Sequence, residues 1–265
     1  MSLRGLGETT RPSPEISAQE LRAAIRQGYK GTTSGLATGH VQCNLVVLPA
    51  SHAQHFVAFC KANPSALPLV GVGQPGDPHF PELALNGDIR TDLGGYLYQS
   101  PGKAPLQLTD LRSQWQEDAV AVLLGCWFTA EAVLAAAGVR LRHVELGIQG
   151  GLFRTKRACV SAGGFEGPLV VSMRPFLERE LDKVKALTRQ LPMAHGEPLH
   201  EGDPRGLGIN DLSKPDWGEP LLAESGEVPL YWGCGLTANE VLSRANLPWY
   251  ATHQPGRMWV TDLKI

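Results

Sequence analysis

Apolar and polar positions alternate along this chain in blocks that predict helices and strands in turn. Residues 17–28 (SAQELRAAIRQG) have apolar side chains at helical spacing, and Ser17 with Glu20 forms the capping box that starts a helix. The apolar, β-branched run that ends at Pro49 predicts a strand, and residues 51–64 predict a second helix. The first part of the chain is therefore expected to form helix, strand and helix in sequence.

Two later segments repeat one pattern of residues. GCWFTAEAVL begins at Gly125 and GCGLTANEVL begins at Gly233, and at this offset of 108 seven residues are identical as far as Ala137 and its counterpart. Each segment joins an apolar strand to a helix and then to a second apolar run. Residues 119–145 and 228–253 are therefore interpreted as duplicated strand-helix-strand units.

This order of elements predicts an α/β fold. We expect a layered fold with a mixed, largely parallel sheet, the duplicated strand-helix-strand units, and a smaller inserted α+β domain. The main α/β domain is expected to comprise residues 15–145 together with 226–265, and the inserted α+β domain residues 146–225. Within the insert, GPLVVSMRP predicts a strand and residues 176–190 an amphipathic helix.

Composition and charge exclude several classes of protein. The chain has 265 residues, 43% of them hydrophobic, and a formal net charge of −2 with both signs mixed along its length. Neither nucleic acid nor a membrane is therefore an expected partner. The most apolar run is about half the roughly 20 residues that a membrane-spanning helix needs, the N-terminus has no signal pattern, and five cysteines without CxxC spacing indicate reduced thiols. We expect a cytoplasmic protein that acts on a small molecule, with a homodimer left open.

Two glycine-rich motifs do not predict a nucleotide site. GVGQPG at residues 71–76 follows a strand, but Pro78 and Pro81 stand where a dinucleotide site requires a helix. GTTSG at residues 31–35 lacks the Gly-Lys-Ser/Thr ending of a P-loop, although its backbone amides can hold a carboxylate. No cofactor is expected.

Arginines at strand ends and one polar loop are the candidates for chemistry. Arg154 follows a Gly-Gly loop and Arg174 ends an apolar strand, positions suited to bidentate binding of a carboxylate. The loop HGEPLHEGDP brings His195, His200 and Asp203 within nine residues. Three interpretations of this loop stay open: a general acid/base pair with an orienting aspartate, a metal site of unfamiliar spacing, and hydrogen bonds that only order the loop.

Longer stretches resemble a known family. The chain is similar to the D-glutamate cyclase family of bacterial hydro-lyases in GHVQCNLVVLP, DIRTDL, GCWFTAE, FRT, GPLVVSMRP, HGEPLHEGDP, GEVPLYWGCGLT and THQPGRMWVTDL. It departs from the family pattern where Gly94 replaces a proline after RTDL, where residues 149–152 read QGGL instead of NVPM, and where GCWFTAE replaces GCSFSFE. These loops are expected near the site, so the departures bear on the choice of substrate.

The resemblance implies a hydro-lyase of amino-acid metabolism that closes D-glutamate, or a related acidic amino acid, to 5-oxo-D-proline with loss of water. Such an enzyme must hold the α-carboxylate, for which we expect Arg154 and Arg174, with Arg90 third. It must also move protons, for which the two histidines of the polar loop are suited, with the loop aspartate fixing a tautomer. Glycine-rich loops after Thr32 and Gly233 are expected to donate backbone hydrogen bonds to the oxyanion.

The two cysteines keep a second interpretation open. Cys126 and Cys234 stand at equivalent strand-to-helix turns and are expected beside the substrate. They are either small packing residues or the two thiols of a two-base amino-acid racemase or epimerase. A third interpretation is a non-catalytic subunit that binds an amino acid or lactam, which would need the arginines but not the polar loop.

Overall fold

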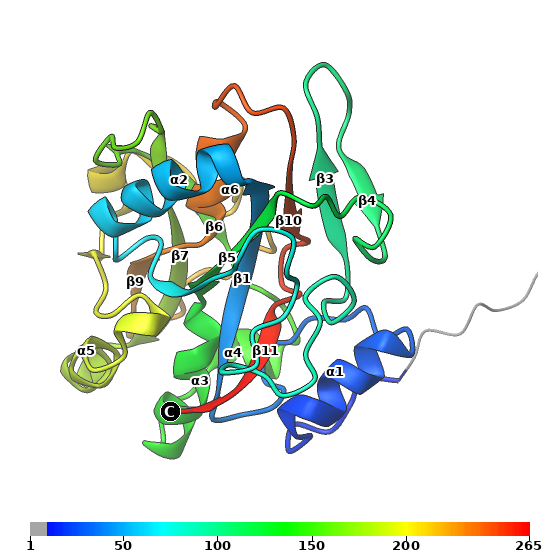
Figure 1. The fold of residues 1–265 in the computed structure, drawn as a ribbon. Helices are drawn as coiled ribbons and strands as arrows, with labels where there is room; N and C mark the ends of the chain where they lie inside the picture. Colours follow the sequence, from blue (N-terminus) through cyan, green and yellow to red (C-terminus); the bar gives the residue numbers. More distant parts are fainter. Residues whose placement is uncertain (1–9) are drawn as a thin grey trace, which may run out of the picture.

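Two antiparallel β-sheets form the centre of the molecule in the computed structural model, which describes residues 10–265 (Figure 1). The first sheet has the order β2 (Leu69–Val72), β5 (Ala119–Gly125), β1 (His40–Pro49), β10 (Tyr250–His253), β3 (Tyr96–Gln99) and β4 (Leu106–Leu108), and β11 (Trp259–Lys264) also pairs with β1. The second has the order β6 (Leu152–Ala158), β7 (Pro168–Leu177), β9 (Glu227–Gly233) and β8 (His200–Glu201).

Short helices surround these sheets. The α-helices are α1 (Ala18–Arg26), α2 (Ala50–Ala62), α3 (Glu131–Ala136), α4 (Arg142–Glu145), α5 (Leu181–Arg189) and α6 (Leu236–Leu242). The 3₁₀ helices are η1 (Trp127–Ala130), η2 (Glu178–Glu180), η3 (Pro192–Ala194) and η4 (Pro204–Leu207). Among residues 10–265, no helix has the length and apolar character needed to cross a bilayer.

The prediction of a largely parallel sheet was wrong: the fold is mixed α/β with antiparallel strands. β5 is buried along its whole length and β1 along nearly all of it. Uninterrupted apolar strands are typical of parallel sheets, but an antiparallel strand covered on both faces has the same pattern. Helix α2 does connect two strands that point the same way, β1 and β2, but β5 lies between them and pairs antiparallel with both.

Several local predictions are confirmed. The Ser17 hydroxyl accepts from the Glu20 N–H (3.2 Å) and the Glu20 carboxylate accepts from the Ser17 N–H (3.0 Å), which completes the capping box of α1. β1 ends at Pro49 and α2 follows it directly. The predicted helix at 176–190 is shorter, because residues 176 and 177 end β7 and α5 begins at Leu181.

The two repeats share their strand and helix but differ in their third element. The Thr129 hydroxyl accepts from the Gln42 N–H of β1, and the Thr237 hydroxyl accepts from the Val170 N–H of β7, both at 3.0 Å. Each threonine therefore ties its turn to the strand that neighbours β5 or β9. The third element is the strand β10 in the second repeat but the helix α4 in the first, where Leu141 and Val144, three residues apart, pack onto the cluster that includes Leu134.

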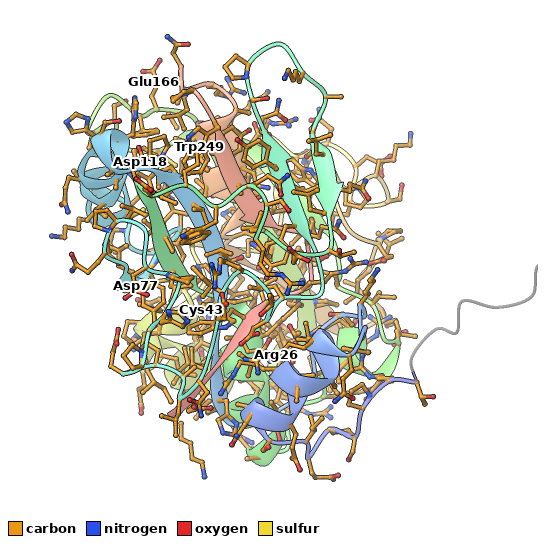
Figure 2. The ribbon with its side chains drawn as sticks, turned by 45° about the vertical axis from the view of Figure 1, so that its right-hand side comes forward. Arg26, Cys43, Asp77, Asp118, Glu166 and Trp249 are labelled. Atoms are coloured by element: carbon orange, nitrogen blue, oxygen red, sulfur yellow. The ribbon has the colours of Figure 1, made fainter. Side chains whose placement is uncertain are left out.

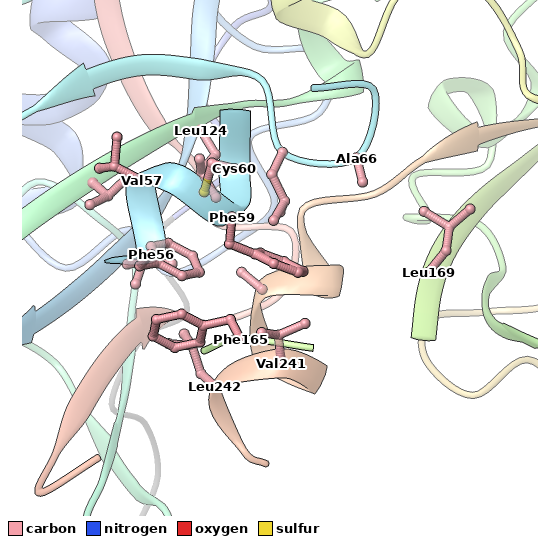
Figure 3. Packing of buried hydrophobic residues seen from close by; sticks show 14 of the residues in the cluster. Phe56, Val57, Phe59, Cys60, Ala66, Leu124, Phe165, Leu169, Val241 and Leu242 are labelled. Carbon is pink, nitrogen blue, oxygen red and sulfur yellow. The ribbon is translucent and has the colours of Figure 1, made fainter. Parts of the chain in front are cut away.

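One hydrophobic core joins the two sheets. It includes Val46 of β1 and Val171 of β7, and α2 and α6 contribute to it (Figure 3). The rings of Phe56 and Phe165 meet edge to face at 5.4 Å and 70°, a geometry that adds about 0.5–1.5 kcal/mol to their burial. The division of the chain at residues 146 and 225 stays a prediction, although both sheets share this core.

Arginines fasten α1 to the rest of the molecule. Arg26 extends from α1 (Figure 2), and its Nε and Nη2 donate to the two carboxylate oxygens of Asp92 at 2.6 Å each. Arg22, on the same helix, donates from Nη1 to the Val260 carbonyl of β11 at 2.8 Å. Asp92 is the second aspartate of the family-like stretch DIRTDL and is fully buried. This stretch therefore has a structural function in holding α1.

Candidate functional site

A small pocket lies where the two Gly-Cys turns meet. Cys126 directly follows β5 and Cys234 directly follows β9, and both line the pocket together with Asn44 of β1 and Ser172 of β7. The pocket therefore takes its walls from both sheets and from equivalent positions of the two repeats. Its free volume is about 30 Å³, which is room for one or two water molecules.

Close approach of other backbone segments requires the glycine of each Gly-Cys pair. A Cβ atom on Gly125 would collide with the carbonyl oxygen of Met193, and one on Gly233 would collide with the carbonyl oxygen of Ser65. Both glycines are thus needed for packing. Because these glycines have no side chain, the backbone at Met193 and the backbone at Ser65 can lie directly against the two turns.

Arg174 is the single lysine or arginine among the described residues that line the pocket. Its side chain is buried, its Nη1 donates to the Met173 carbonyl at 2.8 Å, and its guanidinium lies 5.0 Å from the centre of the Trp127 ring. None of the ion pairs formed within residues 10–265 involves it. Burial lowers the pKa of Arg174, and the nearby Glu131 carboxylate opposes this effect.

Buried donors around this guanidinium lack partners. Arg174 Nε, Ser172 Oγ and Trp127 Nε1 have no hydrogen-bond partner among residues 10–265, and all three residues line the pocket. An unpaired buried donor costs about 1–3 kcal/mol, so native folds keep few of them. None of the described residues that line the pocket is acidic. This arrangement suits a ligand that brings its own acceptor oxygens and a negative charge.

Two buried histidines also line the pocket. Nδ1 of His195 lies 3.0 Å from the Ser65 carbonyl oxygen, and Nδ1 of His253 lies 3.2 Å from the Leu45 amide nitrogen. Burial lowers the pKa of both imidazoles to about 4, so both are neutral at pH 7. His195 has a left-handed backbone (φ 73°), which a non-glycine residue adopts only where its surroundings hold it.

Burial favours the protonated form of both pocket cysteines. Burial raises the pKa of the Cys126 thiol well above its ordinary value and raises that of Cys234 to about 11. The thiol is a poor nucleophile and a poor base compared with the thiolate. A two-thiol mechanism would therefore need a bound substrate to lower one of these pKa values.

A buried carboxylate lies behind Trp127. Glu131 accepts hydrogen bonds from the Ser34 hydroxyl and the Gly35 amide, both at 2.7 Å, and lies 2.9 Å from Nε2 of His143. The Trp127 ring meets the His143 ring edge to face at 5.3 Å. The GTTSG loop thus holds a carboxylate of its own chain. The Glu131–His143 pair packs behind the Trp127 ring, and the Arg174 guanidinium packs on that ring.

The other predicted arginines have carboxylate partners of their own. Arg154 pairs with Glu240 at 2.8 Å and with Asp216 at 3.0 Å, and Arg90 pairs with Asp88 at 2.8 Å. Neither arginine lines the pocket. Their charges are already compensated, so the carboxylate-binding functions expected of them stay predictions that this geometry does not favour.

The polar loop does not gather its three residues into one group. His195 lies in the pocket, whereas Nε2 of His200 lies 2.7 Å from the Asp203 backbone oxygen. The Asp203 carboxylate caps η4 and pairs with Arg205 at 2.6 Å, and hydrogen bonds from Arg205 lower the pKa of Asp203 to about 2. Within residues 10–265 no group of three or more His, Cys, Asp or Glu side chains is arranged to hold a metal ion.

The pocket therefore brings together four of the predicted residues, Cys126, Cys234, Arg174 and His195. Sequence reasoning missed His253, Asn44 and Ser172. Two signals pointed to them: His253 belongs to the family-like stretch THQPGRMWVTDL, and the other two are polar residues inside largely apolar strands.

Comparison with known proteins places the chain among proteins of one family. The family model described as D-glutamate cyclase matches residues 120–262. A protein of Jannaschia sp. (strain CCS1) named "Putative hydro-lyase" is 47% identical over 247 residues, which are 93% of this chain and 93% of that protein. Proteins with the same description from Bradyrhizobium diazoefficiens and Pseudomonas aeruginosa are 41% and 44% identical over 97% and 91% of this chain, and over 94% and 92% of their own lengths.

A search of solved structures matches a nitrogen repressor-like protein from Methanococcus jannaschii, with a TM-score of 0.39 and 9% identity over 89% of this chain and 94% of that one.

Proposed function

Because the chain belongs to the D-glutamate cyclase family and its curated relatives are named as hydro-lyases, we propose that it is a hydro-lyase that closes D-glutamate to 5-oxo-D-proline in the pocket between the two Gly-Cys turns. The single observation that carries the choice of site is the buried guanidinium of Arg174, which has no carboxylate partner among residues 10–265. A substrate carboxylate would compensate this charge.

The unpaired donors support binding of the α-carboxylate. Arg174 Nε and the Ser172 hydroxyl have no acceptor among the described residues, and a carboxylate offers two oxygens that can accept from both. Charge-assisted hydrogen bonds of this kind contribute about 1.5–3 kcal/mol each. The α-carboxylate of an amino acid is therefore the group we assign to this end of the pocket.

The absence of acidic side chains among the described lining residues favours a neutral amine. An ammonium group without a carboxylate partner loses its proton more readily in a dry site than in water. In glutamate, transfer of one proton from the ammonium to the γ-carboxylate gives the amine nucleophile and the carboxylic acid that the reaction needs. The amine nitrogen then bonds to the carbon of the γ-carboxyl group, one C–O bond of that group breaks, and one water leaves.

The pocket must widen to admit glutamate, because its free volume of about 30 Å³ holds only one or two water molecules. Gln149 and Pro255 belong to loops that line it, and residues 149–152 are among those that differ from the family pattern. We assign these loops the movement that admits substrate and the selection among acidic amino acids.

A two-thiol racemase or epimerase is the second candidate, because Cys126 and Cys234 line the same pocket from equivalent turns. Burial opposes it, since it keeps both thiols protonated. The racemase would abstract the α-proton with one thiolate and return a proton from the other thiol, without loss of water.

One experiment separates these functions. The purified protein is incubated in deuterated water with D-glutamate, L-glutamate and both enantiomers of 5-oxoproline, and each mixture is followed by NMR. Lactam formation from D-glutamate supports the proposal, and exchange of the α-proton without lactam supports the racemase. Line broadening alone indicates a binding subunit. Arg174→Lys should abolish most lactam formation, because lysine lacks the planar fork, while Arg140→Lys, at an exposed Arg140–Glu145 pair, serves as the control.

A further inference from the structure

We infer that His195 and His253 are held in opposite neutral tautomers, so that His195 presents a basic nitrogen to the pocket and His253 presents an N–H donor. This inference rests on the proposed function for its chemistry, but the two tautomers are a property of the protein alone. Both residues line the pocket, and neither Nε2 atom has a hydrogen-bond partner among residues 10–265.

The partner of His195 requires a proton on Nδ1. The Ser65 carbonyl oxygen, 3.0 Å from Nδ1, can only accept a hydrogen bond, so Nδ1 must donate it. In a neutral imidazole the other nitrogen then carries no proton. Ser65 is held in place by its close approach to Gly233, where a Cβ atom would collide with the same carbonyl oxygen.

The partner of His253 requires the opposite arrangement. The Leu45 N–H points at Nδ1 with a nitrogen–nitrogen distance of 3.2 Å, and an amide can only donate, so Nδ1 must accept. The Leu45 carbonyl oxygen lies farther away, at 3.4 Å. The proton of the neutral ring is therefore on Nε2, which becomes a donor to whatever occupies the pocket.

Burial keeps both rings neutral. It lowers the pKa of His195 and that of His253 to about 4. Arg174 is the one permanently charged side chain among the described lining residues. The two histidines thus keep distinct functions across the neutral pH range.

Once the carboxylate is bound, lactam formation still requires proton transfer and stabilisation of an oxyanion, and the opposite tautomers suit these two tasks. As the amine attacks the γ-carboxyl carbon, Nε2 of His195 takes a proton from the nitrogen, and the resulting imidazolium returns this proton to the departing hydroxide, which leaves as water. Nε2–H of His253 donates a hydrogen bond to the oxyanion of the tetrahedral intermediate without losing its proton, because a neutral imidazole is a weak acid. Both rings end the cycle in their starting tautomers.

The test combines NMR of the full chain with two pairs of variants. With ¹⁵N-labelled histidine, signals are assigned by their loss in the variants, and the wild type should have a proton on Nδ1 of His195 and on Nε2 of His253 from pH 6 to pH 8. The same tautomer in both residues, or a charged ring at pH 7, would overturn the inference. If the wild type forms no lactam, the proposed function fails, while the spectrum still decides the tautomers.

The variants distinguish the function of Nε2, which we assign to the pocket, from that of Nδ1, which forms the backbone hydrogen bond. Asparagine places its amide at the position of Nδ1, so His195→Asn and His253→Asn keep the backbone hydrogen bonds and lose Nε2. We expect kcat to fall about 10²- to 10⁴-fold for His195→Asn and about 10²- to 10³-fold for His253→Asn. Glutamine places an N–H at the position of Nε2, so His253→Gln should recover part of the lost turnover.

His195→Gln should recover none, because an amide is not a base. Full turnover in both asparagine variants, or recovery by glutamine at 195 but not at 253, would contradict the assigned functions. His55→Gln, at an exposed position of α2, is the matched control and should keep wild-type turnover.

Discussion

Replacing Arg174 by methionine should stabilise the fold while it abolishes turnover. The guanidinium is 2% exposed and forms no ion pair within the described part of the chain. Methionine fills a similar elongated space with an apolar, adaptable side chain and removes the charge. The substitution therefore distinguishes the effect of Arg174 on the stability of the fold from its effect on turnover.

The expected gain in stability is the difference between two opposed effects. Burial of an unpaired charge costs several kcal/mol. Arg174 recovers about 1.5–3 kcal/mol through its charged hydrogen bond to the Met173 carbonyl, and about 1–2 kcal/mol through its contact with the Trp127 ring. We expect Arg174→Met to gain about 1–2 kcal/mol, which raises the melting temperature by about 2–8 °C for a chain of this size.

The same substitution should nearly eliminate catalysis. Loss of two charge-assisted hydrogen bonds to the substrate carboxylate costs about 3–6 kcal/mol, which lowers kcat/KM about 10²- to 10⁴-fold. Thermal melts with and without 5-oxo-D-proline measure stability and ligand binding, and NMR with D-glutamate measures turnover. The ligand should raise the melting temperature of the wild type but not that of the variant.

Arg154→Met provides the comparison, because Arg154 has its own ion pairs with Glu240 and Asp216. Its side chain is 42% exposed, so the substitution should cost less than about 1 kcal/mol and leave turnover intact. If Arg174→Met instead melts several degrees below the wild type and still turns over substrate, the guanidinium is a structural group and the reasoning fails.

Three further outcomes are expected. Below pH 6.5 His195 and His253 take up protons in the unfolded chain but stay neutral in the folded protein until the pH is about 4. The free energy of unfolding should therefore fall with pH, by up to about 1.4 kcal/mol per unit for each histidine and by about 3 kcal/mol in total from pH 6.5 to 5; urea melts that are independent of pH in this range would exclude it. Cys126→Ser and Cys234→Ser should each keep lactam formation within about tenfold; inactive serine variants would favour the two-thiol mechanism. Gly125→Ala should lower the free energy of unfolding by about 1–3 kcal/mol or more, because the added Cβ collides with the Met193 backbone carbonyl; an unchanged melting curve would show that the backbone at Met193 moves away without loss of stability.

Features that depend on neighbours in the chain were determined by the sequence itself. The capping box of α1 involves residues three apart, β1 ends where Pro49 precedes a helix, and both Gly-Cys turns follow an apolar run. The family match also depends on contiguous stretches, and it covers more than half of the chain. The sequence singled out Arg174 as a strand end before Pro175, although β7 in fact continues to Leu177. The Gly-Cys repeat was enough to single out the two pocket cysteines.

Only the tertiary structure decided strand direction and the pairing of charges. A strand buried on both faces has the same apolar pattern in parallel and antiparallel sheets, so β5 could not reveal its orientation. Arg154 and Arg174 look alike in the sequence, but Arg154 meets Glu240, 86 residues away, while Arg174 meets no carboxylate among residues 10–265. The tautomers of His195 and His253 depend on backbone groups 130 and 208 residues distant, because the hydrogen bond that fixes a proton forms between neighbours in space.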